Sequence, residues 1–280
     1  MSNTNKRIFL SPPFVGAVER AAVRGAFDSG YVAPCGPQVD EFERRLAKLA
    51  GRRYAVAVSS GTAAIDLLMA ELGVDETWTV IAPTLTFIAT VGPAFHRGAK
   101  LVFVDSDATG NIDVSLLEDA LESFRGDTKI LVIGVDLYGN CCNYSAIAKL
   151  CRKFGALFVA DAAEAVGATR DGRPAGSAGL AGVYSFNGNK IVTTSGGGAI
   201  VTDDRGLAGR ARKRAQQSRE KCIWYEHREV GYNYRLSNIL AAIGLSQLDR
   251  LPAILKKRKD RKSTRLNSSH NVISRMPSSA

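Results

Sequence analysis

Lys190 is the residue whose position most favours covalent chemistry. It ends the segment SFNGNK at 185–190, which follows an expected strand and precedes the glycine-rich segment SGGG at 195–198. A lysine on backbone held between a strand end and a glycine turn has a fixed position, and its amine can bond to a carbonyl carbon. Because most lysines are solvated surface groups, this interpretation needs support from other residues.

Asp161 directly follows an apolar strand, in the segment VADAAEA at 159–165. The carboxyl ends of parallel strands are where open α/β sheets bind ligands. A buried carboxylate there needs a cationic partner, which a protonated ring nitrogen would supply. The alternative is that Asp161 caps the next helix. Glu164 would lie one helical turn further on, either beside the ligand or as a capping-box glutamate.

Two other strand ends carry residues suited to a planar, phosphorylated ligand. The segment SSGTAA at 59–64, centred on Gly61, Thr62 and Ala63, is a small-residue turn into a helix, where free N–H groups and the helix dipole favour phosphate. A generic strand-to-helix turn would look the same, and without a following lysine it is not a Walker-type loop. Phe87 follows the next strand, and its ring either stacks on a ligand or packs in the core.

Together these features match the requirements of pyridoxal phosphate. The cofactor needs a lysine for its imine, a carboxylate at its ring nitrogen, a phosphate cup and an aromatic ring against its face. Each feature alone is a modest indication, but all of them follow strand ends. We therefore predict a pyridoxal phosphate site with Lys190 as the Schiff-base lysine and Asp161 at the ring nitrogen.

The elements that must position these residues alternate between β-branched runs and helical patterns. This alternation predicts an α/β fold, a three-layer α/β/α arrangement around a mostly parallel seven-stranded sheet. The expected strands cover residues 55–59, 79–82, 101–105, 130–135, 157–160, 183–186 and 199–202. Three- and four-residue apolar spacing predicts helices over 15–28, 38–50, 62–72, 114–124 and 144–154, and a last helix from 236 to 259.

The domain organisation follows from the same patterns. We expect an N-terminal segment at 1–30, a cofactor-binding large domain at 31–250 and the start of a helix toward a small domain at 251–261. The stretch 262–280 is rich in Ser, Asn and Arg and has little hydrophobic periodicity, so it is interpreted as a non-native tail and excluded from the fold.

Composition excludes several other classes of protein. The chain has 280 residues, 45% of them hydrophobic, and its apolar runs are far shorter than the roughly 20 residues of a membrane span. The net charge of +10 includes a basic block at 256–262 without interleaved aromatics, which favours a solvated helix end over a nucleic-acid site. The five cysteines lack metal-ligand spacing, so we expect no metal, and without a signal peptide we expect a cytoplasmic protein.

The chain resembles the DegT/DnrJ/StrS-type sugar-nucleotide aminotransferases, which have the aspartate-aminotransferase-like fold. The resemblance rests on segments such as SGTAA at 60–64, LYG at 137–139, DAAE at 161–164, SFNGNK at 185–190 and GYNYR at 231–235. It implies that Lys190 also moves the substrate proton, while Gly61, Thr62, Ala63 and Ser185 hold the phosphate, Phe87 stacks on the ring and Glu164 occupies a position where the family often has glutamine.

The resemblance also implies partners and a reaction. Asn233 would reach the cofactor of a neighbouring subunit in a homodimer, and Tyr225, His227 and Arg235 would contact the substrate. Because family members that remove a sugar hydroxyl carry histidine instead of lysine at position 190, the expected reaction is transamination from L-glutamate to a nucleotide-linked keto-sugar. The segment VDLYGNC at 135–141 is most similar to members acting on UDP-4-keto-6-deoxy-N-acetylhexosamine in glycan or lipopolysaccharide synthesis.

Two alternatives remain beside this interpretation. Family members continue for roughly another hundred residues, within ordinary domain sizes, as a C-terminal small domain that is largely missing here. The chain could therefore be a fragment that binds the cofactor without catalysing transfer. A nicotinamide-dependent oxidoreductase is the other alternative, and the absence of a GxGxxG segment after a first strand argues against it.

Overall fold

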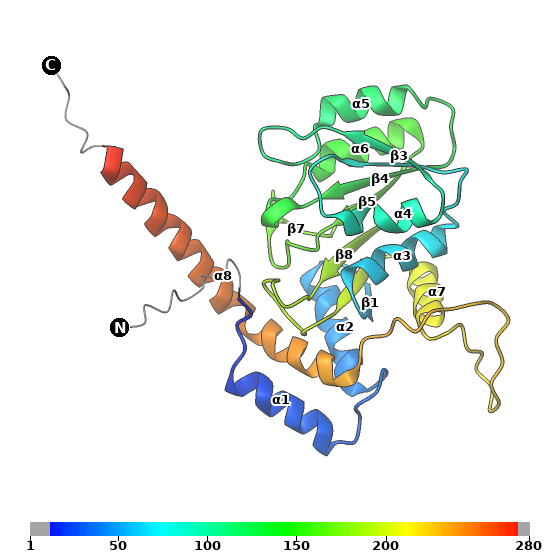
Figure 1. Ribbon diagram of the computed structural model, residues 1–280, viewed down its shortest axis with the longest axis vertical. Helices are drawn as coiled ribbons and strands as arrows, with labels where there is room; N and C mark the ends of the chain where they lie inside the picture. The colour runs from blue at the N-terminus through cyan, green and yellow to red at the C-terminus, as the bar shows by residue number, and fades with distance from the viewer. Residues whose placement is uncertain (1–11, 274–280) are drawn as a thin grey trace, which may run out of the picture.

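The protein is built around a seven-stranded sheet with the strand order β1-β9-β8-β5-β4-β2-β3 (Figure 1). A computed structural model describes the backbone of residues 12–273 and the side chains of residues 12–259. The strands are β1 (Tyr54–Val58), β2 (Thr79–Pro83), β3 (Lys100–Val104), β4 (Ile130–Val135), β5 (Leu157–Asp161), β8 (Ala181–Ser185) and β9 (Gly198–Thr202). Each lies within two residues of an expected strand.

The sheet is parallel apart from one strand. The β2–β3, β2–β4, β4–β5 and β5–β8 pairs are parallel, whereas β9 runs antiparallel to both β8 and β1. The predicted mostly parallel seven-stranded sheet is therefore confirmed. Since β2, β4, β5 and β8 point the same way, their carboxyl ends lie at one edge of the sheet, where open α/β sheets bind ligands.

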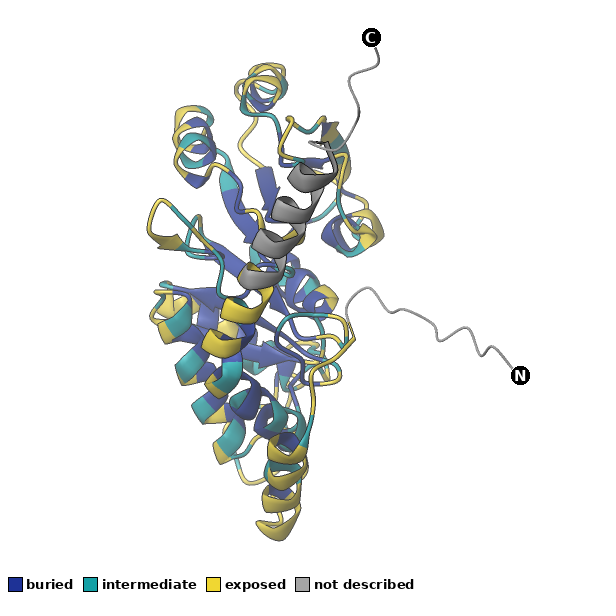
Figure 2. Ribbon diagram, turned by 90° about the vertical axis from the view of Figure 1, so that its left-hand side faces the viewer, coloured by how far each residue is buried: buried dark blue, intermediate teal, exposed yellow. Residues whose placement is uncertain are grey.

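Helices cover both faces of the sheet. One apolar cluster joins Leu131 and Ile133 of β4 to α3 (Gly61–Leu72), α4 (Gly92–His96) and α7 (Arg205–Ala215). A second cluster joins Ile130 and Val132 to helices on the other face, which are α2 (Pro37–Leu49), α5 (Val114–Glu122), α6 (Tyr144–Phe154) and part of α8 (Asn238–Ile273). Figure 2 shows the buried strands between these layers. Because successive strand residues point to opposite faces, this alternation gives the predicted three-layer fold.

The ends of the helices are set by local polar groups. Ser60, Asp113, Asn143 and Asp204 cap α3, α5, α6 and α7 by accepting hydrogen bonds from first-turn N–H groups. Such caps satisfy donors that have no partner inside the helix. α3 and α6 end at glycines in the left-handed conformation, the usual C-terminal signal.

Two helices from distant parts of the chain, α1 and the first part of α8, pack together outside the three layers. α1 (Ala17–Asp28) lies against the first part of α8 (Figure 1), where Glu19 accepts hydrogen bonds from Gln247 and Arg250. α8 begins at Asn238 and runs to Ile273, so one helix crosses the expected boundaries at 250 and 261. Among the described residues, no helix is long and apolar enough to cross a membrane.

Some elements were not expected from the sequence. α7 is rich in Arg and Lys and buries only Leu207 and three alanines, so its apolar pattern is faint. The short helices η1 (Ile88–Thr90), α4 and η2 (Leu137–Gly139), and the hairpin of β6 (Thr169–Arg170) and β7 (Arg173–Pro174), fall in loop-like sequence. η1 and η2 both border the functional site described next.

Candidate active site

A cavity of about 500 Å³ lies at the carboxyl ends of the central strands. This volume is within the range of small-molecule sites. Its walls come from the start of α3, from η1 and η2, and from the segments after β4, β5 and β8, and they include Gly61, Thr62, Phe87, Thr90, Asp136, Tyr138, Asp161, Glu164, Ser185 and Lys190. The cavity thus joins the candidate lysine and the candidate carboxylate, which lie far apart in the chain.

Asp161 forms the buried end of the cavity. Its side chain is almost fully buried, and its Oδ2 accepts a hydrogen bond of 2.7 Å from the Thr90 hydroxyl. Burial raises the pKa of this carboxyl group, and the bond from Thr90 opposes that rise. No helix follows β5, so Asp161 is not a helix cap; its Oδ1 accepts only a local bond from the Ala163 N–H, at 3.1 Å.

Lys190 and Glu164 form an ion pair in the cavity wall. The distance from Lys190 Nζ to Glu164 Oε1 is 3.2 Å, and the Lys190 side chain is only 17% exposed. The other carboxylate oxygen of Glu164 accepts a 2.9 Å hydrogen bond from the N–H of Tyr138, whose backbone is left-handed with φ of 53°. Since no helix follows β5, Glu164 is not a capping-box residue. Its carboxylate instead connects the lysine to the η2 turn.

The start of α3 meets the end of β8 in the wall of the same cavity. A Cβ on Gly61 would lie 3.0 Å from the Ser185 Cβ, so glycine permits this close approach. Ser60 Oγ already accepts the Ala63 N–H at 3.0 Å. The N–H groups of Gly61 and Thr62 belong to a first turn that offers no intrahelical acceptor. The Ala63 N–H is engaged by Ser60, whereas Gly61, Thr62 and Ser185 lie together in the cavity wall. Contact of Ala63 with a phosphate stays a prediction.

Phe87 lies at the cavity wall just before η1, and its side chain is 73% exposed. A phenylalanine that served only core packing would be buried, so the core-packing alternative for Phe87 is wrong. Stacking on a ligand stays a prediction. The sequence analysis did not assign Thr90 or Tyr138 to the site. η1 has no sequence signal, and the LYG segment of η2 indicated a family resemblance but not a place in the cavity wall. Asp136 was also missed, although it follows the buried strand β4 just as Asp161 follows β5.

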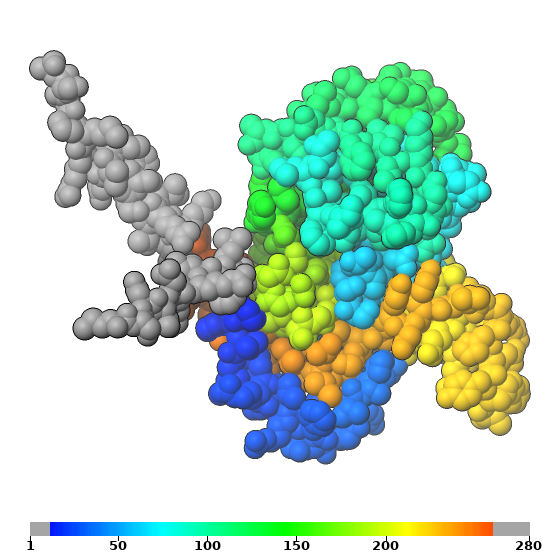
Figure 3. Space-filling view, viewed as in Figure 1, coloured from blue at the N-terminus to red at the C-terminus, as the bar shows by residue number. Residues whose placement is uncertain are grey.

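Three of the expected substrate or partner contacts lie away from this cavity. Tyr225, His227 and Asn233 belong to residues 216–234, called here the arm, which projects from the side of the molecule (Figure 3). The arm folds back on itself through bonds such as Gln217 N–H to Tyr232 O, at 2.8 Å. His227 Nδ1 lies 2.8 Å from Gln217 O, so this histidine is held within the arm itself.

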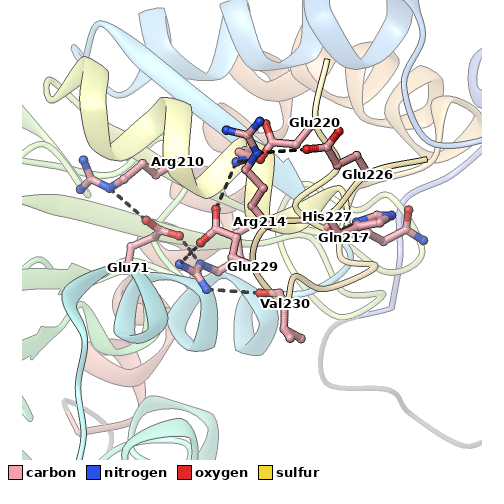
Figure 4. A network of polar contacts seen from close by, with 11 residues as sticks. Glu71, Arg210, Arg214, Gln217, Glu220, Glu226, His227, Glu229 and Val230 are labelled. Atoms are coloured by element: carbon pink, nitrogen blue, oxygen red, sulfur yellow. Dashed lines mark hydrogen bonds and ion pairs between the residues drawn. The ribbon is translucent and has the colours of Figure 1, made fainter. Parts of the chain in front are cut away.

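An ion network holds the base of the arm (Figure 4). Glu71 of α3, whose side chain is almost fully buried, pairs with Arg210 and Arg214 of α7. Arg214 also pairs with Glu229 of the arm, at 3.0 Å. The arm is thereby fixed to the body of the protein.

Arg235 has a different environment from the one expected. Its side chain is buried, forms an ion pair with Glu43 and donates a 3.1 Å hydrogen bond to the Ala57 carbonyl oxygen. It does not line the cavity. The guanidinium binds the segment after the arm to α2 and β1, and the substrate contact expected from the sequence stays a prediction.

The family follows from comparison with known proteins. A family model described as the DegT/DnrJ/EryC1/StrS aminotransferase family matches residues 14–270. The chain belongs to this family. The resemblance in the sequence motifs is confirmed.

Individual members of the DegT family agree with this assignment. EpsN of Bacillus subtilis is 43% identical over 91% of the chain, which covers 66% of EpsN. A GDP-perosamine synthase of Caulobacter vibrioides is 39% identical over 88% of the chain, which covers 65% of that enzyme. The chain thus spans about two thirds of the length of these relatives.

Solved structures of the DegT family show the same fold. Spr1654 from Streptococcus pneumoniae, determined in PLP and PMP forms, aligns with a TM-score of 0.83 at 29% identity, over 91% of this chain and 69 to 70% of that one. PseC of Helicobacter pylori, an aminotransferase involved in pseudoaminic acid biosynthesis, has a TM-score of 0.83 at 28% identity over 91% of this chain and 68% of its own.

Proposed function

We propose that the protein binds pyridoxal 5'-phosphate in this cavity and transfers an amino group from L-glutamate to a nucleotide-linked keto-sugar. The observation that carries the proposal is the convergence of the Lys190 amine, the Asp161 carboxylate and the first turn of α3 on one cavity. Family membership supports it, as do relatives named GDP-perosamine synthase and UDP-4-amino-4,6-dideoxy-N-acetyl-beta-L-altrosamine transaminase.

The residues present fit this cofactor. Asp161 is buried, and within the described part of the chain it forms no ion pair, so a cationic ring nitrogen would supply the missing partner. In the same cavity, Gly61 lies against Ser185 and leaves first-turn N–H groups for a phosphate. The cavity therefore offers a buried negative charge and an anion-binding turn, which matches a pyridinium ring carrying a phosphate.

Each residue has a defined task in the proposed reaction. The bound cofactor supplies a ring that withdraws electrons from the substrate carbon. Asp161 would hold the proton on the ring nitrogen, and Thr90 fixes the orientation of Asp161. Lys190 would hold the cofactor and would carry a proton from and to the substrate carbon. Glu164 holds the lysine ammonium near the cavity, and Phe87 offers its exposed ring to the cofactor.

The arm favours a homodimer in the proposed function. Its residues Ile223 and Val230 are 95% and 88% exposed, which is unusual for large apolar side chains on a free surface. Tyr225, His227 and Asn233 of the arm lie outside the cavity of their own subunit. We infer that they act at the cavity of a second copy, where Asn233 would contact the phosphate and Tyr225 and His227 the sugar nucleotide.

The identity of the keto-sugar acceptor is the most specific part of the proposal. The VDLYGNC segment at 135–141 favours UDP-4-keto-6-deoxy-N-acetylhexosamine as acceptor, in glycan or polysaccharide biosynthesis. A GDP-linked keto-sugar is the competing acceptor, because three of the relatives are GDP-perosamine synthases. Incubation of the protein with glutamate and each keto-sugar nucleotide, followed by mass analysis of the product, separates these acceptors.

Cofactor attachment tests the site itself. Borohydride reduction after incubation with pyridoxal phosphate is expected to leave a stable adduct on Lys190, located by peptide mapping. Lys190→Ala is expected to abolish the adduct, whereas Lys153→Ala, which removes an exposed lysine on α6, is expected to leave it unchanged. An adduct elsewhere would refute the site. If glutamate fails to convert the bound cofactor to its amine form, the chain is a cofactor-binding fragment.

A further inference from the structure

A second buried acid, Asp136, follows the strand that lies beside the strand of Asp161. The two residues end the adjacent strands β4 and β5, where Val135 is the register partner of Asp161. The backbone N–H of Asp136 donates to the Asp161 carbonyl oxygen at 2.9 Å. Asp136 has no exposed surface and belongs to the cavity wall. None of the functions assigned above uses this residue.

The surroundings of Asp136 hold a charged carboxylate in place. Its Oδ1 accepts a 2.9 Å hydrogen bond from the Cys142 N–H, and its Oδ2 accepts the hydroxyl of Tyr144. Tyr144 is fixed in turn, because its oxygen accepts the Gly176 N–H at 3.0 Å. Both carboxylate oxygens thus face donors, an arrangement that favours the ionised form.

The charges around the cavity do not balance. Its lining contains the carboxylates of Asp136, Asp161 and Glu164 but only one amine, that of Lys190. That amine pairs with Glu164, and neither aspartate forms an ion pair within the described part of the chain. Successive strand positions point to opposite faces, so the two side chains leave their adjacent strands toward different faces of the sheet. As like charges in a buried region they still disfavour each other's ionisation unless a cation lies near. Burial raises the pKa of Asp136 to about 6, so the group is mostly ionised at neutral pH.

We propose that Asp136 is a positioning residue whose carboxylate, fixed by Tyr144 and Cys142, adds a second negative charge behind Asp161 and strengthens the hold of the cavity on a cationic heterocycle. The proposal rests on the proposed cofactor. Asp161 contacts the ring nitrogen, while Asp136 acts through Asp161 by charge and by the bond to its backbone. The cofactor's cationic form is thus stabilised by two carboxylates.

The test is the binding of pyridoxal phosphate to purified protein, followed by its visible absorbance as a function of pH. Asp136→Asn keeps the shape of the side chain and removes its charge. It is expected to weaken cofactor binding about tenfold, equal to about 1.4 kcal/mol. It is also expected to lower the pH at which the bound cofactor loses its proton by about one unit, because the protonated form loses a stabilising charge.

Two tyrosine variants distinguish an effect of the Asp136 charge from a structural defect. Tyr144→Phe removes the hydroxyl that stabilises the Asp136 carboxylate, so it is expected to shift the absorbance midpoint in the same direction by a smaller amount. Tyr184→Phe is the matched control, since it removes another buried hydroxyl nearby, one that donates to the Ala175 carbonyl oxygen at 2.5 Å. It is expected to leave the midpoint unchanged. Tyr144→Phe also provides the readout if Asp136→Asn does not fold.

The outcomes are distinguishable. A wild-type protein that fails to bind pyridoxal phosphate overturns the proposed function together with this inference. Normal binding by the wild type, with Asp136→Asn folded and unchanged in both affinity and midpoint, overturns only the role of Asp136. Weaker binding without a midpoint shift also overturns it, because a merely structural defect has that signature. Equal shifts in Tyr144→Phe and Tyr184→Phe would likewise contradict the charge argument.

Discussion

The hydroxyl of Thr90 lies 2.7 Å from Oδ2 of Asp161, although 71 residues separate them in the chain. Thr90 is buried in the short helix η1, between β2 and α4. It donates to a carboxylate whose pKa is raised by burial, and this bond opposes that rise. A single turn with no sequence signal therefore helps to set the ionisation of a buried acid in the site.

Thr90→Val is expected to weaken pyridoxal phosphate binding by about five- to twentyfold. The variant has the same shape but leaves one oxygen of a buried carboxylate without its donor, which costs about 1–2 kcal/mol. Titration of the purified protein with the cofactor measures the change. Thr84→Val is the control, because Thr84 donates to the exposed Asp105. Thr90→Ser is expected to restore most of the affinity, and equal affinity of all variants would contradict a role for the hydroxyl.

Arg235→Ala is expected to destabilise the fold by about 2–3 kcal/mol, because it removes one of the two arginines that pair with the buried Glu43 carboxylate and leaves only Arg212 to compensate its charge. Urea unfolding measures this loss. Arg44→Ala removes an exposed pair with Glu41 and is expected to leave stability nearly unchanged, because solvent screens such a pair. A stable Arg235→Ala protein with selectively lost sugar-nucleotide binding would instead favour the substrate role expected from the sequence.

The pH dependence of stability is expected to show the raised pKa of Asp136. Its pKa rises from 3.8 to about 6 on folding, so between these values the folded state binds more protons than the unfolded state. Stability contributed by this group is therefore lost as pH rises from about 4 to about 6, on the order of 2–3 kcal/mol. Asp136→Asn has no titrating group at this position, so its stability does not fall for this reason as the pH rises. Relative to wild type, the variant is expected to gain stability over that pH range, measured by urea unfolding; a constant difference would contradict the shift.

Glu71→Ala is expected to release the arm. Removal of this buried carboxylate leaves Arg214 without one of its two partners and weakens the attachment of α7 to α3. Trypsin is then expected to cleave after Arg219, Lys221 or Arg228 several times faster than in wild type, because local opening exposes the backbone. Arg210→Ala removes only the more exposed partner of Glu71 and is expected to have little effect. Equal cleavage rates would show that the network does not restrain the arm.

The sequence by itself determined the sheet, the layers and the two ends of the site. Strand ends are marked locally, by apolar runs that stop at Asp161 or at the small residues before α3, and parallel strands bring such ends to one edge. The sequence alone therefore placed four residues in one site: Lys190, Asp161, Gly61 and Thr62. Asp136 carries the same signal after β4 and could have been recognised in the same way.

Only the tertiary structure decided which side chains face one another. Thr90 reaches Asp161, and Arg235 reaches Glu43 across 192 residues, through turns and loop paths that no periodicity encodes. The same applies to Glu164, since its contact with Tyr138 depends on the left-handed turn of η2 and not on a helix after β5. Hydrophobic spacing reports which face of an element is buried, whereas the partner of a buried charge depends on how distant segments pack.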